Sequence, residues 1–214
     1  MSKRILAMVV SAAAILALSP LLTVIALLIK REDGGPVLYS GVRAGLNGHP
    51  FRMHKFRTMT VNADKIGGPN TPDDDPRITQ IGCKLRNYKL DELPQLWNVL
   101  VGEMSLVGPR PQVLEEVALY SEEERHLLTV RPGITDWASI RFRNEGEILR
   151  GAADPYEAYR NHIRPEKIQL GLAYVNHASV ATDIRILAST AKSILSDFSR
   201  RSPKTAPPNK DIAN

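Results

Sequence analysis

Cysteine and the common catalytic signatures are scarce in this chain of 214 residues. Its single cysteine, Cys83, permits no intrachain disulfide and no cysteine-rich zinc site. The five histidines are scattered, and no His-Glu-x-x-His pair occurs. A Walker A loop, a G-x-G-x-x-G sequence and a G-x-S-x-G sequence are also missing. The usual support for an ATPase, a dinucleotide-binding enzyme or a serine hydrolase is therefore lacking.

The charge is only mildly unbalanced, with a formal net charge of +5 and a sequence pI of about 9.4. Such an excess favours anionic partners, whether nucleotides, phospholipid head groups or nucleic acid. The basic residues are dispersed and no repeat of aromatic and basic residues accompanies them, so we do not expect nucleic acid to be the partner. The length predicts one catalytic domain with a core of its own.

One long apolar run is present near the N-terminus. Residues 5–29 are 25 uncharged positions, roughly 38 Å as a straight helix, against ~30 Å for the hydrocarbon core of a bilayer. Lys3 and Arg4 precede the run, and Lys30 and Arg31 follow it. Because basic residues prefer the cytoplasmic side, both ends are predicted to stay there.

Ser19 and Pro20 interrupt this run. Pro20 has no backbone N–H and its ring crowds the carbonyl of Leu16, while the Ser19 hydroxyl can satisfy a freed carbonyl. The two legs would be roughly 22 Å and 15 Å long, too short to span alone. We predict a re-entrant membrane helix–break–helix over residues 1–31. A spanning helix with a proline kink stays open as an alternative, whereas a signal peptide is disfavoured because charged residues follow the run.

The remainder contains no stretch apolar enough to enter lipid, so residues 32–198 are predicted to form a globular domain. Residues 51–59 alternate like a strand, residues 37–39 resemble a shorter strand, and the glycines of residues 41–50 predict a loop. With several helices expected, the fold class is α+β, mainly helical, with short strands. The polar residues 199–214 are predicted to be a disordered tail.

Apolar residues at helical spacing mark two segments. The first predicted helix face, expected to be buried, comprises Leu93, Leu96, Trp97 and Leu100. The second comprises Val180, Ile184, Leu187, Ala191 and Leu195. This second, amphipathic helix either packs on the core, which is our expectation, or lies on the membrane. Ser121, Asp154 and Pro165 mark the starts of three more helices.

Two adjacent carboxylates, Asp91 and Glu92, form the first candidate site. Asp91 is placed to cap a helix, whose N-terminus would keep it ionised and favour a phosphate beside it. An ionised aspartate can attack phosphorus, and adjacent carboxylates can hold a divalent cation. An ordinary helix cap beside a helix-dipole glutamate is the alternative, and from these two residues alone it is favoured.

Basic residues form the second candidate site. Lys55 and Arg57 are two apart on a predicted strand, so they share a face. Arg110 stands between Pro109 and Pro111, which restrict the backbone around it. Arginine forks match phosphate oxygens, and several together can neutralise a diphosphate, although each alone is better explained as a solvated surface charge. The further candidates are Arg77, Arg86, Arg131, Arg141 and Arg143.

Taken in order, these strings resemble the bacterial sugar transferase family, the monotopic polyprenyl-phosphate phosphoglycosyltransferases, in their minimal short form. The resemblance runs over nearly the whole chain, to about residue 198. The matching pieces are Ser19-Pro20, Gly35-Pro36-Val37, the glycine-spaced stretch from Arg43 to Phe51, Lys55-Phe56-Arg57-Thr58-Met59, Asp75-Pro76-Arg77, Leu85-Arg86, Leu90 to Asn98, Met104 to Pro111, and Arg131-Pro132-Gly133-Ile134-Thr135.

This resemblance implies a reaction and the residues that perform it. Asp91 would attack the β-phosphate of a UDP-sugar, expel UMP and carry the phosphosugar until polyprenyl (undecaprenyl) phosphate takes it up. Glu92 would assist the acceptor or bind Mg²⁺ together with Asp91. The implied phosphate- and substrate-binding residues are Lys55, Arg57, Arg77, Arg86, Arg110, Arg131 and Arg143. The product would begin the assembly of an exopolysaccharide or another glycoconjugate.

The resemblance also implies the re-entrant anchor, places the catalytic domain on the cytoplasmic face of the bacterial inner membrane, and allows a homodimer. The sequence departs from the family pattern at Lys89, where a small residue is common, and again in the run from Thr135 to Asn144. Only Arg143-Asn144 aligns with the end of the family pattern there, and we place this run near the sugar or nucleotide. These departures leave the donor sugar open. A non-catalytic membrane-anchored binding or scaffold protein on the same fold is the alternative function.

Overall fold

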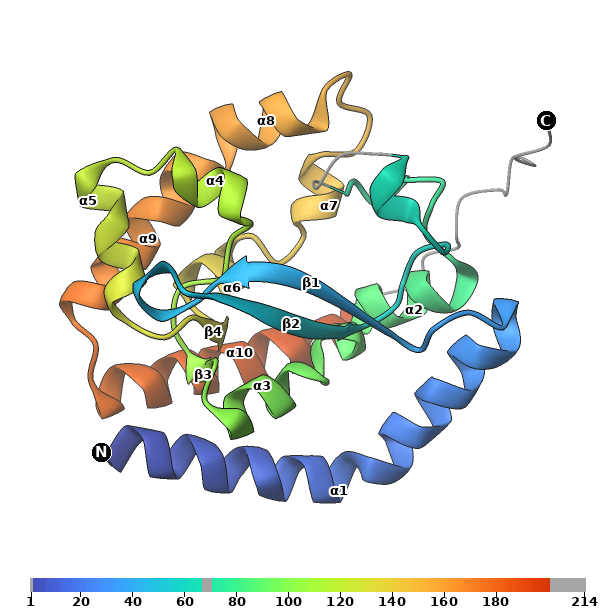
Figure 1. The fold of residues 1–214 in the computed structure, drawn as a ribbon, viewed down its shortest axis with the longest axis horizontal. Coiled ribbons are helices and arrows are strands. Elements are labelled where there is room, and N and C mark those ends of the chain that lie inside the picture. The colour runs from blue at the N-terminus through green and yellow to red at the C-terminus, as the bar shows by residue number, and fades with distance from the viewer. Residues whose placement is uncertain (1, 67–70, 201–214) are drawn as a thin grey trace.

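The structure, a computed structural model, describes residues 2–66 and 71–200. It is mainly helical with two small two-stranded sheets, which confirms the predicted α+β class. Figure 1 shows the long helix α1 (Ser2–Asp33) along one side of the molecule, and the paired strands β1 (Leu38–Ala44) and β2 (Pro50–Phe56) across its middle. Of the predicted tail, residues 201–214 lie outside the described residues, and residues 199 and 200 belong to the last helix.

Short elements follow one another along the rest of the chain. They are η1 (Leu46–Gly48), η2 (Ala63–Lys65), α2 (Gln80–Tyr88), η3 (Leu90–Glu92), α3 (Gln95–Val101), β3 (Ser105–Val107), α4 (Leu114–Ala118), α5 (Glu122–Arg125), η4 (His126–Thr129), β4 (Gly133–Thr135), α6 (Trp137–Arg141), α7 (Glu145–Ile148), α8 (Pro155–His162), α9 (Arg164–Asn176) and α10 (Val180–Arg200), where η denotes a 3₁₀ helix. The three predicted helix starts are confirmed. Ser121 caps α5, Asp154 caps α8, and Pro165 lies in the first turn of α9.

Pro20 lies inside α1, which continues through it as one helix of 32 residues. The hydroxyl of Ser19 donates a hydrogen bond of 2.8 Å to the backbone oxygen of Leu16, the acceptor that the missing N–H of Pro20 leaves free. The freed carbonyl thus keeps a partner, which is why the helix tolerates the proline. The predicted break is therefore wrong in form: Figure 1 shows a bend in α1, and the helix ends at Asp33, two residues beyond the predicted boundary.

Most of the apolar surface of α1 is exposed. The buried residues are Ala7, Ser11, Ile25 and Ile29. The exposed large apolar residues are Ile5, Leu6, Met8, Val9, Val10, Leu16, Leu21, Val24, Leu27 and Leu28. Within the described residues, α1 is the one helix long and apolar enough to cross a membrane, judged by length and composition alone. A core helix of a soluble protein would be mostly buried, so the exposure of α1 is compatible with membrane anchoring.

The N-terminal end of α1 is bound to two other helices. The ammonium of Lys3 forms an ion pair of 2.9 Å with Asp183 of α10. The guanidinium of Arg4 donates a hydrogen bond of 2.9 Å to the backbone oxygen of Leu100, near the C-terminal end of α3. A cation there also complements the negative end of the helix dipole. The start of α1 is therefore fixed to the globular part of the chain.

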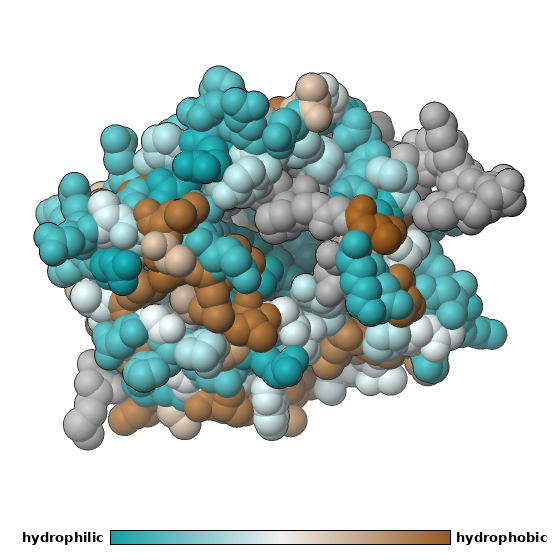
Figure 2. All heavy atoms as spheres, turned by 45° about the horizontal axis from the view of Figure 1, so that its top comes forward, coloured by the Kyte–Doolittle hydropathy of each residue, from teal (hydrophilic) through white to brown (hydrophobic). Residues whose placement is uncertain are grey.

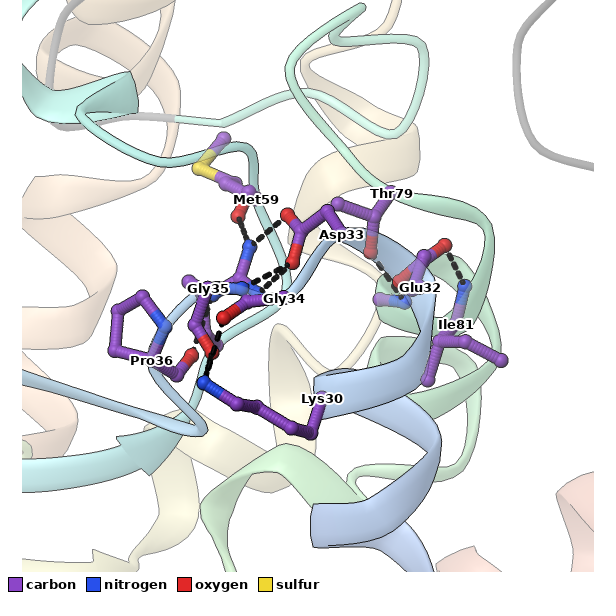
Figure 3. Close-up of polar contacts among 11 residues, drawn as sticks. Lys30, Glu32, Asp33, Gly34, Gly35, Pro36, Met59, Thr79 and Ile81 are labelled. Carbon is purple, nitrogen blue, oxygen red and sulfur yellow. Dashed lines mark hydrogen bonds and ion pairs between the residues drawn. The ribbon is translucent and has the colours of Figure 1, made fainter.

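The C-terminal end of α1 is clamped to the same globular part (Figure 3). Both carboxylate oxygens of Asp33 accept hydrogen bonds from the guanidinium of Arg57, at 2.5 Å and 2.6 Å, just beyond the end of β2. The carboxylate of Glu32 accepts the backbone N–H of Ile81 at 3.0 Å, in the first turn of α2. A carboxylate at that position satisfies a helix N–H that has no partner within its own helix.

β1 and β2 pair antiparallel in a register that places Leu38 opposite Phe56. The alternating pattern predicted the strand correctly over residues 51–56, but β2 ends at Phe56, so residues 57–59 are not part of it. Residues 41–44, predicted as loop, are instead part of β1 because they pair with β2. The glycine at position 41 indicates a loop locally, and only the cross-strand partner makes the segment a strand. The hairpin places Lys55 of β2 next to η3 and the candidate carboxylates.

The second sheet depends on two glycines. β3 and β4 pair in parallel, with Ser105 opposite Gly133. A Cβ atom at Gly133 would lie well inside 3.0 Å of the Gly108 backbone, and one at Gly108 would meet the backbone oxygen of Arg131. Only glycine permits this approach. The sheet thereby fixes the segment that leads from Gly108 to Arg110.

The two predicted apolar helix faces differ in burial. Of the face predicted near α3, Leu96 is buried and Leu93 and Leu100 are half-buried, so the expectation holds in part, but Trp97 is 54% exposed. On α10, Ile186 is fully buried, whereas the predicted core face is largely exposed, and Leu195 reaches 68%. The expectation that this face packs on the core is therefore wrong. The inward side of α10 is partly polar, and there Thr190 exchanges a hydrogen bond of 2.8 Å with Thr135 of β4.

Candidate active site

Asp91 and Glu92 lie in η3, between α2 and α3. Lys89 ends α2 in the left-handed conformation, with φ 57° and ψ 24°, and this reverses the chain so that η3 starts directly. The residue that precedes α3 is Pro94, which makes no side-chain cap. The expectation that Asp91 caps a helix is therefore wrong. Its side chain is free for another role because the αL turn, and not a capping carboxylate, sets the entry into η3.

Glu92 is held by two cations. The ammonium of Lys55 donates to Oε1 at 3.0 Å, and Nη2 of Arg110 donates to the same oxygen at 2.5 Å. Burial alone would raise the pKa of Glu92, but the charges of Arg110 and Lys55 and the hydrogen bond from Arg110 outweigh it and hold the pKa well below its usual value. Glu92 is therefore ionised, and it orients the two cations.

Asp91 is buried, with 8% of its surface exposed. In the described part of the chain, no hydrogen bond or ion pair engages its carboxylate. Burial, followed by the negative charge of Glu92, raises the pKa of Asp91, while Lys55, Lys89 and Arg86 act in the opposite direction. A raised pKa makes a carboxylate more basic, and the absence of a partner leaves its oxygens available. These are properties that a nucleophile or a cation ligand needs.

Two cavities, each of about 280 Å³, meet at this pair. The polar cavity is lined by Asp91 and by the cations Arg43, Lys55, Arg86, Lys89, Arg110, Arg143 and Lys167 among others. The exposed wall of the second cavity, called here the apolar cavity, is mostly apolar and includes Leu93, Leu96, Ile134, Ala138, Ile140, Ile168 and Ile194. Charged side chains also line it, among them Arg110, Arg143, Arg164, Lys167, Glu116, Asp136 and Glu145. Lys89, Glu92 and Arg110 belong to both cavities. The face drawn in Figure 2 is hollowed at its centre, and the surface inside the hollow is hydrophilic.

The predicted basic residues divide into two groups. Lys55, Arg86, Arg110 and Arg143 line the polar cavity with Asp91. Arg57, Arg77 and Arg131 do not line either cavity. The side chain of Arg77 is paired with Asp75 at 2.6 Å, and that of Arg131 donates to the backbone oxygen of Gly102 at 2.9 Å. The sequence alone does not distinguish these two groups.

The position of Arg57 shows that strand alternation alone does not identify the residues that line the cavities. It was expected to share a face with Lys55, but β2 ends at Phe56 and Arg57 lies beyond the strand. Besides Asp33, its guanidinium binds the backbone oxygens of Pro36, at 2.6 Å, and Met59, at 3.0 Å. With four hydrogen bonds to the protein and 6% of its surface exposed, Arg57 clamps α1 and lines neither of the two cavities.

Several cavity residues were not predicted as site residues. Arg43 comes from β1, where it opens a stretch that matches the family pattern, whereas Tyr159 and Lys167 come from α8 and α9, far from the candidate motifs in sequence. Tyr159 and Lys167 carry no local signal, because only the tertiary fold brings them to the site. Lys89 did carry one, since it departs from the family pattern. Its side chain lines both cavities, and within the described residues no ion pair or hydrogen bond engages its ammonium. Burial lowers the pKa of Lys89, although the charges of Glu92 and Asp91 oppose this.

A preformed metal centre is not found: the described residues contain no group of three or more His, Cys, Asp or Glu side chains suited to a metal ion. The two carboxylates of η3 differ, since that of Glu92 is engaged by two cations while that of Asp91 is not. Mg²⁺ is commonly held by one or two carboxylates plus the phosphates of a substrate. The donor set therefore fits a magnesium ion that arrives with a diphosphate better than a resident ion.

Comparison with known proteins adds a family match. A family model described as bacterial sugar transferase matches residues 1–197. The sugar transferase EpsL of Bacillus subtilis (strain 168) is 40% identical over 78% of this chain and 74% of its own length. The UDP-N-acetylgalactosamine-undecaprenyl-phosphate N-acetylgalactosaminephosphotransferase of Aeromonas hydrophila is 37% identical over 86% of this chain and 41% of its own. The UDP-glucose:undecaprenyl-phosphate glucose-1-phosphate transferase of Xanthomonas campestris pv. campestris is 38% identical over 85% of this chain and 36% of its own length. The chain thus spans about three quarters of the first relative and well under half of the other two.

Proposed function

Because this chain belongs to the bacterial sugar transferase family, we propose that it transfers a phosphosugar from a UDP-sugar to polyprenyl phosphate, in bacteria undecaprenyl phosphate, and releases UMP. The names of the two longer relatives support both the donor class and the acceptor. Those names specify different sugars, so they do not select one for this chain. The product, a polyprenyl-diphospho-sugar, is a suitable starting point for an exopolysaccharide or another glycoconjugate.

In the first step, a carboxylate oxygen of Asp91 attacks the β-phosphorus of the donor. A bond forms between Asp91 and phosphorus, and the bond to the leaving phosphate oxygen breaks, so UMP departs with the electron pair. The observation that carries this proposal is the contrast between the two carboxylates at the polar cavity. Among residues 2–66 and 71–200, no side chain or backbone group bonds the carboxylate of Asp91, while that of Glu92 is held by Lys55 and Arg110. The two fixed cations are placed to stabilise negative charge that develops on the transferred phosphate.

In the second step, a phosphate oxygen of the lipid attacks the phosphorus on Asp91. The diphosphate bond forms, the bond to Asp91 breaks, and the free carboxylate returns. Glu92 acts in both steps as a positioning residue, because its two partners would otherwise be free to move. Mg²⁺, held by Asp91 and Glu92 together with donor phosphates, would supply additional charge neutralisation when bound.

α1 is proposed to be the membrane anchor, re-entrant from the cytoplasmic face. Its exposed apolar residues and its basic ends support a place in the membrane. Both ends also bind one globular domain, through Lys3 at the start and Asp33 at the end. A helix with both ends on one domain must return them to the same side. The test is the labelling of Lys3→Cys and Arg31→Cys in a Cys83→Ser background: reagent access from one side supports re-entry, and access from opposite sides contradicts it.

The decisive experiment offers a panel of UDP-sugars with undecaprenyl phosphate and follows UMP release. Asp91→Asn should abolish turnover and any labelled covalent adduct, while Asp74→Asn, a matched change at an exposed aspartate outside both cavities, should leave both intact. Full activity of Asp91→Asn would contradict the mechanism. A wild-type protein that releases no UMP with any donor would favour the non-catalytic scaffold. A homodimer is a separate prediction, to be checked by light scattering of the detergent-solubilised protein.

A further inference from the structure

The two cavities differ in a way that one substrate does not explain. The polar cavity contains Asp91, Lys55 and Arg86, and none of these three lines the apolar cavity. A nucleotide diphosphate needs cations around its phosphates, and the polar cavity supplies them. The apolar cavity has a similar volume, about 280 Å³, and reaches the same carboxylate pair at Glu92. It is therefore open to a second ligand of different chemistry.

The apolar cavity extends from the carboxylate pair to α10. Leu96 of α3 and Ile194 of α10 contribute to its wall, as do Thr190 and Ser193 of α10. Figure 1 shows α3 and α10 on the same side of the β1–β2 hairpin as α1, while α7 and α8 lie on the opposite side. The cavity thus connects the carboxylate pair with the half of the molecule that carries the apolar helix α1.

The outer surfaces of these helices are apolar as well. Trp97 on α3 is 54% exposed, and Leu187 and Leu195 on α10 are exposed too. Leu195 directly follows Ile194, which lines the cavity. Exposed apolar surface on three neighbouring helices is typical of a region that contacts lipid. An isoprenoid chain lying in that lipid would meet the cavity wall formed by α10 without crossing the polar cavity.

At its inner end the cavity carries an unengaged cation, the ammonium of Lys89, two residues before Asp91. Lys55 and Arg110 already form ion pairs with Glu92, whereas Lys89 has no ion pair within the described residues. A phosphate that entered from the apolar side would find this cation beside the nucleophile. The αL backbone at Lys89 is unusual for a lysine, and residues held in such conformations cluster at functional sites.

We infer that the apolar cavity receives the first isoprene units of the lipid acceptor, with its phosphate held by Lys89 at the junction of the two cavities. This rests on the proposed function and specifies where each substrate binds. The donor occupies the polar cavity, and after UMP has left, the acceptor phosphate enters from the apolar cavity and reaches the phosphorus on the side opposite its bond to Asp91. In the transfer step, the acceptor oxygen forms the new bond to phosphorus while the bond to Asp91 breaks and its carboxylate is restored.

A pair of tryptophan substitutions on α10 tests this inference in the full-length protein. Ser193→Trp places a large side chain in the wall of the apolar cavity, whereas Ser196→Trp makes the same change at an exposed position that does not line it. Two quantities are measured: the burst of UMP released from a UDP-sugar without acceptor, and the KM for undecaprenyl phosphate. Thermal unfolding of both variants verifies that they fold.

Ser193→Trp should raise the KM for the lipid at least about tenfold, the equivalent of losing ~1.4 kcal/mol of binding. It should change the UMP burst and the KM for the donor less than about twofold, and Ser196→Trp should change neither. A reduced burst with a raised donor KM would show that the cavity holds the nucleoside or sugar, which overturns the inference. Unchanged lipid KM in Ser193→Trp would overturn it too.

A direct binding readout separates this inference from the proposed function. A farnesyl phosphate with a photoreactive group on its first isoprene unit is cross-linked to the wild-type protein, and the labelled residues are mapped by mass spectrometry. Labelling of α3 and α10 residues that line the apolar cavity is expected, and Ser193→Trp should remove it. Labelling confined to other parts of the protein would refute the inference. This result does not depend on UMP release, so the two hypotheses fail separately.

Discussion

Replacing Asp33 tests two roles for Arg57. Its contacts indicate that it fastens α1, whereas the family resemblance implies that it binds a phosphate. Arg57 is 6% exposed and forms two hydrogen bonds with the carboxylate of Asp33, of which about a third is exposed. Hydrogen bonds to charged groups contribute about 1.5–3 kcal/mol, whereas fully exposed ion pairs contribute about 0–1 kcal/mol. Since one partner is buried and the other partly solvated, we expect a coupling energy of about 2 kcal/mol.

The assay is a double-mutant cycle with Asp33→Asn, Arg57→Met and the double variant, measured by thermal unfolding in detergent. About 2 kcal/mol corresponds to a fall in Tm of about 4–8 °C for a chain of this size. The KM for the donor should stay within about twofold of the wild-type value, because Arg57 does not line the polar cavity. Asp74→Asn serves as the matched control at an exposed site.

The pair also predicts how stability depends on pH. The hydrogen bond from Arg57 is the main cause that lowers the pKa of Asp33 in the folded protein, although burial opposes it. The stabilisation is therefore complete above the ordinary pKa of aspartate and is lost as the pH falls through the lower folded-state value. Asp33→Asn should remove this contribution. A coupling energy below about 0.5 kcal/mol, or a tenfold rise in donor KM for Arg57→Met with unchanged Tm, would refute the clamp.

Four further predictions concern the site. Burial and then the charge of Glu92 raise the pKa of Asp91. The rate of the UMP burst should therefore increase with pH, with its midpoint above the ordinary pKa of aspartate. A midpoint at or below that ordinary value would contradict this. For the same reason the folded state loses stability as pH rises between the unfolded and folded pKa values, so Asp91→Asn should raise the Tm. Arg110→Lys, which cannot reproduce the two-pronged contact with Glu92, should lower kcat about 10–100-fold in steady-state assays, and wild-type kcat would disprove the positioning role of Glu92. Lys89→Gly should leave the Tm equal or higher, because the ~1–2 kcal/mol of αL strain that it removes exceeds the stabilisation of the unfolded state by the added entropy of glycine. The same change should raise the KM for undecaprenyl phosphate. A large fall in Tm would show that Lys89 is held by contacts other than those described.

Local chemistry made some features predictable from the sequence. The bond from the Ser19 hydroxyl to Leu16 depends only on the neighbouring Pro20, and the structure contains it. The cap at Asp154 is likewise a short-range effect. Lys55 and Arg110 were placed with the carboxylates through the family resemblance, and the structure brings them together at Glu92. Their assignment to substrate phosphates remains a prediction.

Features that depend on distant partners were not predictable in the same way. Arg57 was grouped with Lys55 by strand alternation, but its partner Asp33 lies 24 positions away at the end of α1. The exposed face of α10 was assigned to the core because a helical period identifies an apolar face without saying what covers it. Tyr159 reaches the site only through the packing of α8, and no motif marks it.

The close contact between Gly108 and Gly133 has a consequence for sequence variation. Neither residue carries a functional group, yet a single added methyl at either would force the backbones of β3 and β4 apart and shift the start of the segment that presents Arg110. The activity should therefore tolerate replacements poorly at two positions that take no part in chemistry. In a mutational scan of this chain, substitutions at Gly108 and Gly133 are expected to reduce activity about as strongly as substitutions at Asp91 and Glu92.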